Sequence, residues 1–161
     1  MKRKKKAGSK KTIPAALKVV SQNDHFLAEI VKSSGDAITI TDKNGTIVFW
    51  NLGARELYGY STKEMVGRPI FDIIPSEKRE IAQETQDHVF AGKPIKNIVT
   101  QRTRRDGKIL DLWVSIVPLR DDTGKIVAAA RIARDITGLK ISENGMSKFD
   151  DSLGKTIDFP F

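Results

Sequence analysis

The 161-residue chain contains no cysteine, which excludes disulfides, thiolate metal centres and cysteine nucleophiles. It has only two histidines, His25 and His88, and their separation in the sequence argues against a metal cluster. No apolar run approaches the ~20 residues needed to cross a bilayer. The basic segment that starts at Lys2 is not followed by the apolar part of a signal peptide. We therefore expect a cytoplasmic protein without a membrane span.

Recognisable catalytic motifs are also missing. The sequence has neither a G-x-x-x-x-G-K-[ST] phosphate loop nor an H-E-x-x-H motif. A phosphoacceptor helix with an ATP-binding domain, or a helix-turn-helix, needs more residues than remain outside one domain. We predict that the protein is not an enzyme, but a sensor or adaptor without its own output, or part of a longer regulator.

Positive charge is concentrated at the start of the chain. Of 28 Lys and Arg residues, seven lie in residues 1–11, which leaves 21 basic against 20 acidic residues in the remainder. Residues 1–11 are therefore predicted to form a disordered basic tail. This tail is either a solvated segment or, through residues 2–11, a segment attracted to nucleic acid or anionic lipid. The lack of accompanying aromatic residues favours the solvated tail.

Residues 12–34 are predicted to form a helix that begins near Pro14, whose missing N–H costs nothing in a first turn. Apolar residues recur at helical spacing on one stripe, which Asp24 interrupts. The candidates for a dimer contact on this stripe are Leu17, Val20, Leu27 and Val31. The helix either lies on the sheet of its own domain or pairs with a second copy, and one helix can do both.

Two short β-rich runs follow, at residues 36–42 and 46–50, and Lys43-Asn44-Gly45 separates them. An Asn-Gly pair between such runs predicts a hairpin, because both residues tolerate positive φ.

Capping signals then predict several short helices. Asn51 is placed to cap the next helix by accepting a hydrogen bond from a backbone amide two or three residues further on. Gly59 suits the left-handed residue after a helix end. Ser61 and Glu64 have capping-box spacing, so another helical turn should start there. Ser76 is a candidate cap for a longer helix.

Three more strands are predicted near residues 95–105, 109–119 and 125–134. Two strands, short helices and three further strands predict an α+β domain with an antiparallel sheet. With the helices on one face, the concave side of the sheet can enclose a pocket. The domain is expected to span residues 35–140, and residues 141–161 to form a loosely ordered tail.

The stretch from Trp50 to Tyr60, W-N-L-G-A-R-E-L-Y-G-Y, resembles the PAS sensor family. M-V-G-R-P-I from Met65, R-R-D-G-K from Arg104 and R-D-I-T from Arg134 resemble it too, in the family's order. The resemblance implies a PAS-like five-stranded antiparallel sheet with short helices on one face and an N-terminal flanking helix. It also implies dimers through flanking helices, as in histidine kinases, cyclic-dinucleotide enzymes and transcriptional regulators.

The resemblance also bears on cofactors. Light-sensing flavin members form a photoadduct with a cysteine, so the lack of cysteine excludes covalent flavin-adduct photochemistry. Haem-binding members place a histidine about two turns before the terminal glycine of the long helix, near residues 81–83 here. His88 lies one turn before Gly92, and a histidine favoured by the helix dipole explains it better. We expect no haem, and the identity of any other cofactor is left open.

Six residues are candidates for lining the ligand pocket or filling the core around it: Asn51, Phe71, Ile74, Leu112, Val114 and Ile116. Asn51 is either a helix cap, which suffices to explain it, or also a pocket wall. Strand alternation places Trp50 and Asn51 on opposite sides, so only one of them should reach the pocket.

Asp135-Ile136-Thr137 ends the last strand, where the chain leaves the domain. We expect Asp135 and Thr137 to hydrogen-bond or pair with Arg104 and Arg105, which would couple the sheet to the exit segment. The alternative is a polar strand end that caps whatever follows.

Together these features predict a PAS-type module that binds a small molecule or a non-covalent cofactor. It would relay a conformational change to a partner in two-component signal transduction or transcription regulation. The expected partner is a second copy, or another PAS or kinase protein. Two alternatives stay open: a ligand-free dimerisation or interaction module, and a nucleic-acid-associated regulator acting through residues 2–11.

Overall fold

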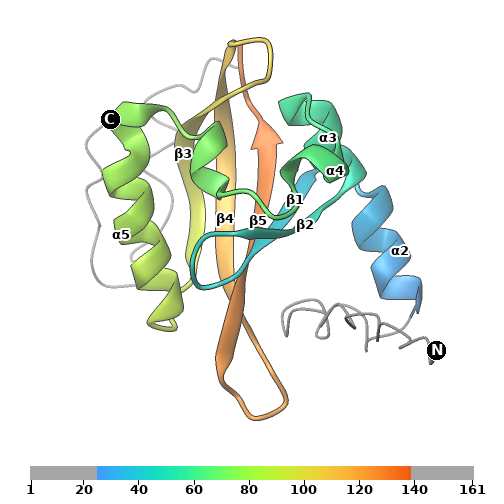
Figure 1. The fold of residues 1–161 in the computed structure, drawn as a ribbon, viewed down its shortest axis with the longest axis vertical. Helices are drawn as coiled ribbons and strands as arrows, with labels where there is room; N and C mark the ends of the chain where they lie inside the picture. Colours follow the sequence, from blue (N-terminus) through green and yellow to red (C-terminus); the bar gives the residue numbers. More distant parts are fainter. Residues whose placement is uncertain (1–24, 139–161) are drawn as a thin grey trace, which may run out of the picture.

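The computed structural model describes residues 25–138, which form one antiparallel sheet of five strands with helices beside it (Figure 1). The helices are α2 (His25–Ser33), α3 (Leu52–Tyr58), α4 (Thr62–Met65) and α5 (Arg79–Phe90), with 3-10 turns at Ile70–Ile73 and Ser76–Lys78. The strands are β1 (Ala37–Thr41), β2 (Ile47–Trp50), β3 (Ile95–Thr103), β4 (Ile109–Arg120) and β5 (Ile126–Asp135). The predicted α+β class and five-stranded PAS-like sheet are confirmed.

The last strand lies in the middle of the sheet, because the strand order is β2-β1-β5-β4-β3. On β5, Arg131 lies opposite Thr39 of β1 and opposite Ile116 of β4. At the β3 edge, Arg102 lies opposite Leu110. This arrangement joins the first and last strands of the domain, so the exit of the chain lies beside its entry.

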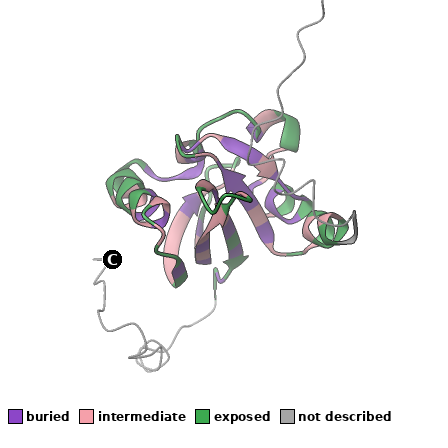
Figure 2. Cartoon of the chain, turned by 90° about the horizontal axis from the view of Figure 1, so that it is seen from below, coloured by how far each residue is buried: buried purple, intermediate pink, exposed green. Residues whose placement is uncertain are grey.

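The main hydrophobic core fills the space between the sheet and the helices, where the strands carry many of the buried residues (Figure 2). The alternating apolar residues of β4 all point into this core, as their spacing predicts: Leu110, Leu112, Val114 and Ile116. Burying each such side chain contributes about 1.5–3 kcal/mol, so this strand anchors the domain.

Most of the predicted helix caps are present. The side chain of Asn51 accepts a hydrogen bond from the amide of Ala54 at 2.8 Å, and Gly59 ends α3 with φ 80. Ser61 and Glu64 form the predicted capping box at the start of α4. The capping signals therefore identified both helix starts correctly.

The predicted hairpin is present, since β1 pairs antiparallel with β2. Of its Asn-Gly pair only Gly45 has positive φ, because the Asp42 carboxylate accepts from the amides of Asn44 and Thr46 and fixes the turn. One local expectation was wrong: Ser76 does not cap α5, since a 3-10 turn starts there and α5 begins only at Arg79. Its hydroxyl hydrogen-bonds the Glu77 carboxylate instead.

The packing of α3 against the start of β1 depends on Gly53. A Cβ atom at this position would lie 2.3 Å from the carbonyl oxygen of Asp36. Because backbone atoms cannot move aside as a flexible side chain can, no larger residue fits without displacing the helix. Gly53 therefore brings α3 close to the entry of the sheet.

Candidate functional site

Several polar side chains are buried in the apolar interior between the sheet and the helices. Its buried polar side chains include Thr41, Gln86, Arg102 and Arg131, and the buried Tyr58 lies among the core residues. Neither arginine was a candidate in the sequence. Arg131 could have been recognised, because it shares strand parity with the buried Ala129 and Ala133 and so had to face inward.

Arg131 links the central strand to α5. One of its terminal nitrogens donates to the hydroxyl of Thr41 at 2.6 Å, and the other donates to Oε1 of Gln86 at 3.2 Å. Nε2 of Gln86 in turn donates to the carbonyl of Lys43 at 3.2 Å. Burial, and to a lesser extent the nearby Arg102, lower the pKa of Arg131 to about 10, while Tyr58 acts in the opposite direction. Arg131 is therefore still a cation at neutral pH.

Arg102 lies on β3, and among residues 25–138 its side chain hydrogen-bonds only neighbours on its own strand. Its Nη1 donates to the hydroxyl of Thr100 at 3.0 Å and to the carbonyl of Gln101 at 2.7 Å. Burial lowers the pKa of Arg102, and the nearby Tyr58 opposes that effect. Arg102 and Arg131, each 7% exposed, are called the buried arginine pair below.

Tyr58 lies within electrostatic reach of the buried arginine pair. Burial raises the pKa of Tyr58 to about 12, although both arginines act in the opposite direction. Its ring contacts Trp50, with 5.2 Å between the ring centroids. The Trp50 indole donates to the carbonyl of Tyr60 at 3.1 Å. Trp50 thus belongs to the core, and Tyr58 adds a protonated hydroxyl there.

The apolar candidates for the pocket lie in or against the same interior. Leu112, Val114 and Ile116 are buried in the main core, and the half-buried Phe71 packs against it. Ile74 is buried as well. Their role as ligand contacts stays a prediction.

Asn51 faces the entry of the sheet, where its amide group joins three segments. Besides capping α3, its oxygen accepts from the amide of Ile38 at 2.8 Å. Its nitrogen donates to the carbonyls of Val31, Ser34 and Asp36. These bonds account for the whole side chain, so the structural role proposed for Asn51 is the one that the geometry supports.

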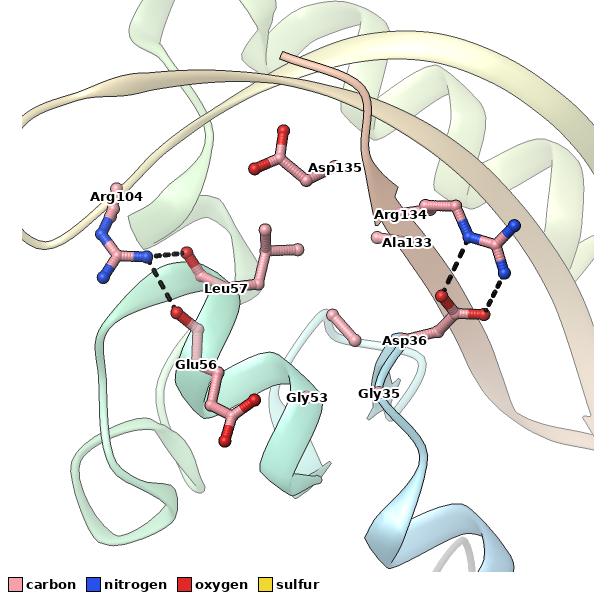
Figure 3. Close-up of a pocket in the computed structure, with 10 residues that line it drawn as sticks. Gly35, Asp36, Gly53, Glu56, Leu57, Arg104, Ala133, Arg134 and Asp135 are labelled. Atoms are coloured by element: carbon pink, nitrogen blue, oxygen red, sulfur yellow. Dashed lines mark hydrogen bonds and ion pairs between the residues drawn. The ribbon is translucent and has the colours of Figure 1, made fainter. Parts of the chain in front are cut away.

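A pocket of about 360 Å³ opens at the end of the sheet where the chain enters and leaves, and is called the rim pocket (Figure 3). It is lined by Gly35, Asp36, Ala37, Gly53, Glu56, Leu57, Arg104, Ala133, Arg134 and Asp135. Arg134 and Asp36 form a two-pronged ion pair across its edge, with bonds of 3.0 and 2.9 Å. This pair ties β5 to the segment just before β1.

Two of the four relay candidates, Arg104 and Asp135, line the rim pocket (Figure 3). The expected direct pairing is absent among the described residues: Asp135 accepts from the amide of Thr137 at 2.8 Å. The hydroxyl of Thr137 accepts from the amide of Asp111 at 3.0 Å. The exit segment is thus bound to β4 rather than to the arginine turn, because a local turn satisfies Asp135 and the β4 backbone satisfies Thr137.

The two turn arginines bind the short helices. Arg104 donates to the carbonyls of Glu56 and Leu57 at the end of α3. Arg105 pairs with Glu64 at 2.9 Å, while its own amide donates to the carbonyl of Tyr58. The β3–β4 turn therefore caps the end of α3. A second open pocket, of about 370 Å³, lies between Gly59 and this turn.

The predicted dimer helix is only partly described. Leu17 and Val20 lie outside the described residues, while α2 contains Leu27, which is 51% exposed, and the half-buried Val31. Ile30 beside them is 49% exposed. In Figure 1, α2 lies beyond α3 at the side of the domain rather than across the sheet. Its apolar surface is available for a second copy.

Residues 25–138 contain neither a group of metal-binding side chains nor a membrane-spanning helix. Within this range no cluster of three His, Asp or Glu side chains is arranged to hold a metal. No helix in the same range has both the length and the apolar character to cross a membrane. His88 is half-buried in the last turn of α5, as its position in the sequence indicates.

Comparison with known proteins connects this geometry to one family. Residues 31–140 match the profile of the PAS fold. Among curated proteins, the chain is 30% identical over 111 residues to the methanogenesis regulatory histidine kinase FilI of Methanothrix harundinacea, covering 69% of this chain and 12% of the kinase. It is 26% identical over 133 residues to a phytochrome of Picea abies, covering 80% of this chain and 11% of the phytochrome. The chain thus spans about a tenth of the length of these relatives.

Solved structures show the same likeness. A PAS domain from Colwellia psychrerythraea superposes with a TM-score of 0.64 and 31% identity, over 68% of this chain and 93% of that one. The PAS domain of an HTR-like protein from Haloarcula marismortui superposes with a TM-score of 0.61 and 23% identity, over 75% of this chain and 98% of that one.

Proposed function

This chain belongs to the PAS fold family, and we propose that it is a sensory module that binds a small molecule or a non-covalent cofactor. Binding would shift the sheet between two arrangements and present that shift to a partner protein. A ligand can drive such a change only by binding one arrangement more tightly than the other. The role proposed is therefore binding and relay rather than catalysis.

The polar interior is the observation that carries this proposal. A domain held together only by its core has no need of buried guanidinium groups, which lose hydration without a gain in apolar burial. Arg131 nevertheless lies on the central strand and reaches α5 through Gln86. The site thus connects the sheet with the long helix, the two layers that a ligand between them would move.

The relay would run along β5. Arg131 faces the interior, and Asp135 ends the same strand at the rim pocket, four residues further on. Arg134 pairs with Asp36 beside the entry, where Asn51 joins α2 to β1. A shift of β5 would therefore reach both the exit segment and α2.

Similarity to a histidine kinase and to phytochromes supports a partner in a signalling chain. We propose a second copy of the chain, or a kinase or another PAS protein, as that partner. Two-component signalling or transcription regulation is the setting that we infer. The expected cytoplasmic location and the nucleic-acid role of residues 2–11, which lie outside the described residues, stay predictions.

Native mass spectrometry and an absorbance spectrum of untagged protein test the binding role. We expect a co-purifying small mass that denaturation releases. Hydrogen exchange before and after its removal should change in α5, in β5 and in the exit at Asp135. In Asp135→Ala the interior should still respond, while the exit should not. Protein that carries no compound and responds to none in a metabolite panel would contradict the proposal.

A ligand-free interaction module is the second candidate. The rim pocket and its neighbour at Gly59 both open at the surface, while core residues such as Leu112 are fully buried. Densely packed core positions of this kind are also what a purely docking domain would have. A stable dimer that carries no compound and exchanges hydrogen identically with every tested metabolite would favour this candidate.

A further inference from the structure

The buried arginine pair carries an electrostatic imbalance inside the core. The acceptors of Arg131 are the hydroxyl of Thr41 and the amide oxygen of Gln86, and both are neutral. Arg102 likewise donates to a hydroxyl and a backbone carbonyl. Within residues 25–138, no Asp or Glu forms an ion pair with either arginine, whereas Arg68, Arg104, Arg105 and Arg134 each have one. Two positive charges thus lie in the core without a counter-ion from this part of the chain.

Such an arrangement is costly for a folded domain. Arginine is seldom fully buried unless it is paired, and removing a charge from water costs several kcal/mol even after relaxation. Here the two charges also repel each other, since Arg102 is one of the groups that lower the pKa of Arg131. An anion from outside the chain would remove both penalties.

Building on the proposed function, we propose that the buried arginine pair binds a small organic acid with at least two carboxylates, held between the sheet and α5. The planar guanidinium fork matches a carboxylate in a two-bond geometry that no other side chain provides as well. The guanidinium groups of Arg102 on β3 and Arg131 on β5 lie on one face of the sheet, and each can bind one carboxylate. The charges of the two arginines and the two carboxylates then nearly cancel inside the apolar core.

The surroundings of Arg131 suit an organic ligand. On the same face of β5 its neighbours Ala129 and Ala133 have small side chains, and both are buried. Tyr58 offers a hydroxyl that stays protonated at neutral pH and can donate to an acid. The acceptors that now hold Arg131 are neutral, so a carboxylate can replace them with a stronger, charge-assisted bond.

Gln86 would transmit the effect of binding to α5 and to the β1–β2 turn. It accepts from Arg131 with one end of its amide and donates to Lys43 with the other, so it links β5, α5 and the β1–β2 turn. Figure 1 shows α5 running along the sheet, and its contacts with the sheet are mainly to β4 and β5. A carboxylate that takes the place of Gln86 on Arg131 would release this link and let α5 shift.

Thermal unfolding with a panel of acids tests the inference. The probes are malonate, succinate and citrate at constant ionic strength, with succinamide as the neutral counterpart of succinate and sodium sulfate as a simple anion. At about ten times its dissociation constant, a bound acid should raise the Tm by roughly 5–10 °C. The rise should disappear in both Arg131→Met and Arg102→Met, and persist in the matched variant Arg55→Met on the exposed face of α3.

Three results would overturn the inference. They are no acid raising the Tm above the sulfate control, a rise that persists in both variants, and an equal rise with succinamide. If Arg131→Met fails to fold, the more conservative Arg131→Lys replaces it, and the rise should shrink because the fork is lost. A neutral compound found by native mass spectrometry, with no response to acids, would refute the carboxylate assignment and leave the sensory role intact.

Discussion

Asn51 and Tyr58 show how single side chains serve two parts of this domain, the entry of the sheet and its interior. Asn51 satisfies backbone groups from α2, β1 and α3, so its amide fixes the entry of the sheet. Tyr58 lies inside, where its hydroxyl is protonated next to two cations. Neither function follows from residue type alone, since each depends on which groups surround the side chain.

Replacing Asn51 with alanine should lower the free energy of unfolding by about 3 kcal/mol or more. The change removes a helix cap, which costs about 1 kcal/mol, and leaves buried backbone partners unsatisfied at about 1–3 kcal/mol each. Urea unfolding followed by circular dichroism measures this. The matched change Asn44→Ala, in an exposed turn, should cost less than about 0.5 kcal/mol. Equal effects of the two changes would refute the structural role of Asn51.

Tyr58 should make stability fall as pH rises from 10 to 12. Its folded pKa is about 12 and the ordinary pKa of tyrosine is 10.0, so in this window the folded chain holds a proton that the unfolded chain has lost. The unfolded state then binds fewer protons, and stability decreases with pH by the linkage relation. The contribution is fully present below pH 10. The difference in unfolding free energy between wild type and Tyr58→Phe should change over this window, and a flat difference would contradict the burial of the hydroxyl.

At the scale of elements, the β3–β4 turn and α3 form one unit. Arg104 and the amide of Arg105 bind the last carbonyls of α3, which would otherwise be unsatisfied at a helix end. Their positive charge also suits the negative end of the helix dipole. The turn is thereby fixed against the rim pocket, next to the exit of β5.

Arg104→Ala should therefore destabilise the domain by about 1–2 kcal/mol, as expected for a charged donor to two carbonyls. Arg105→Ala is the matched control: its ion pair with Glu64 is exposed and should contribute less than about 1 kcal/mol. Thermal unfolding at low and high salt measures both. A loss for Arg105→Ala as large as that for Arg104→Ala would show that the caps are not what holds the turn.

At the scale of the whole molecule, α2 is the described helix that contributes least to the shared core. Leu27 and Ile30 are about half exposed there, beside the half-buried Val31. Apolar side chains on one stripe of a flanking helix suit a contact with a second copy. Under the proposed function, a change in the interior would reach the partner protein through this helix.

We expect the chain to form a dimer that the double change Leu27→Glu and Ile30→Glu converts to a monomer. Charges at these positions would be desolvated in a dimer contact but remain hydrated in the monomer. Light scattering coupled to size-exclusion chromatography measures the mass. Val66→Glu, at a site that is 41% exposed just after the end of α4, should leave the mass unchanged. An unchanged mass for the double variant would favour the interpretation in which the helix serves only its own domain.

Local features of the fold could be predicted from the sequence because short-range physics determines them. The caps at Asn51 and Ser61 act within three residues, and the alternation of β4 needs only its own strand. Ser76 was assigned wrongly as a cap, because a 3-10 turn and a helix start carry the same signal over so short a range. The hairpin at Asn44-Gly45 was predicted correctly, while the part that the Asp42 side chain plays in its turn became clear only from the structure.

The amino-acid sequence by itself determined the class of fold, the order of the strands along the chain, and the absence of cysteine chemistry. Only the tertiary structure decided which partners Asp135 and Thr137 take, and that Arg102 and Arg131 share one interior without a carboxylate from the described residues. The reason is physical. Apolar periodicity and helix-capping signals are local, whereas burial and charge pairing depend on strands far apart in the sequence that the sheet brings side by side.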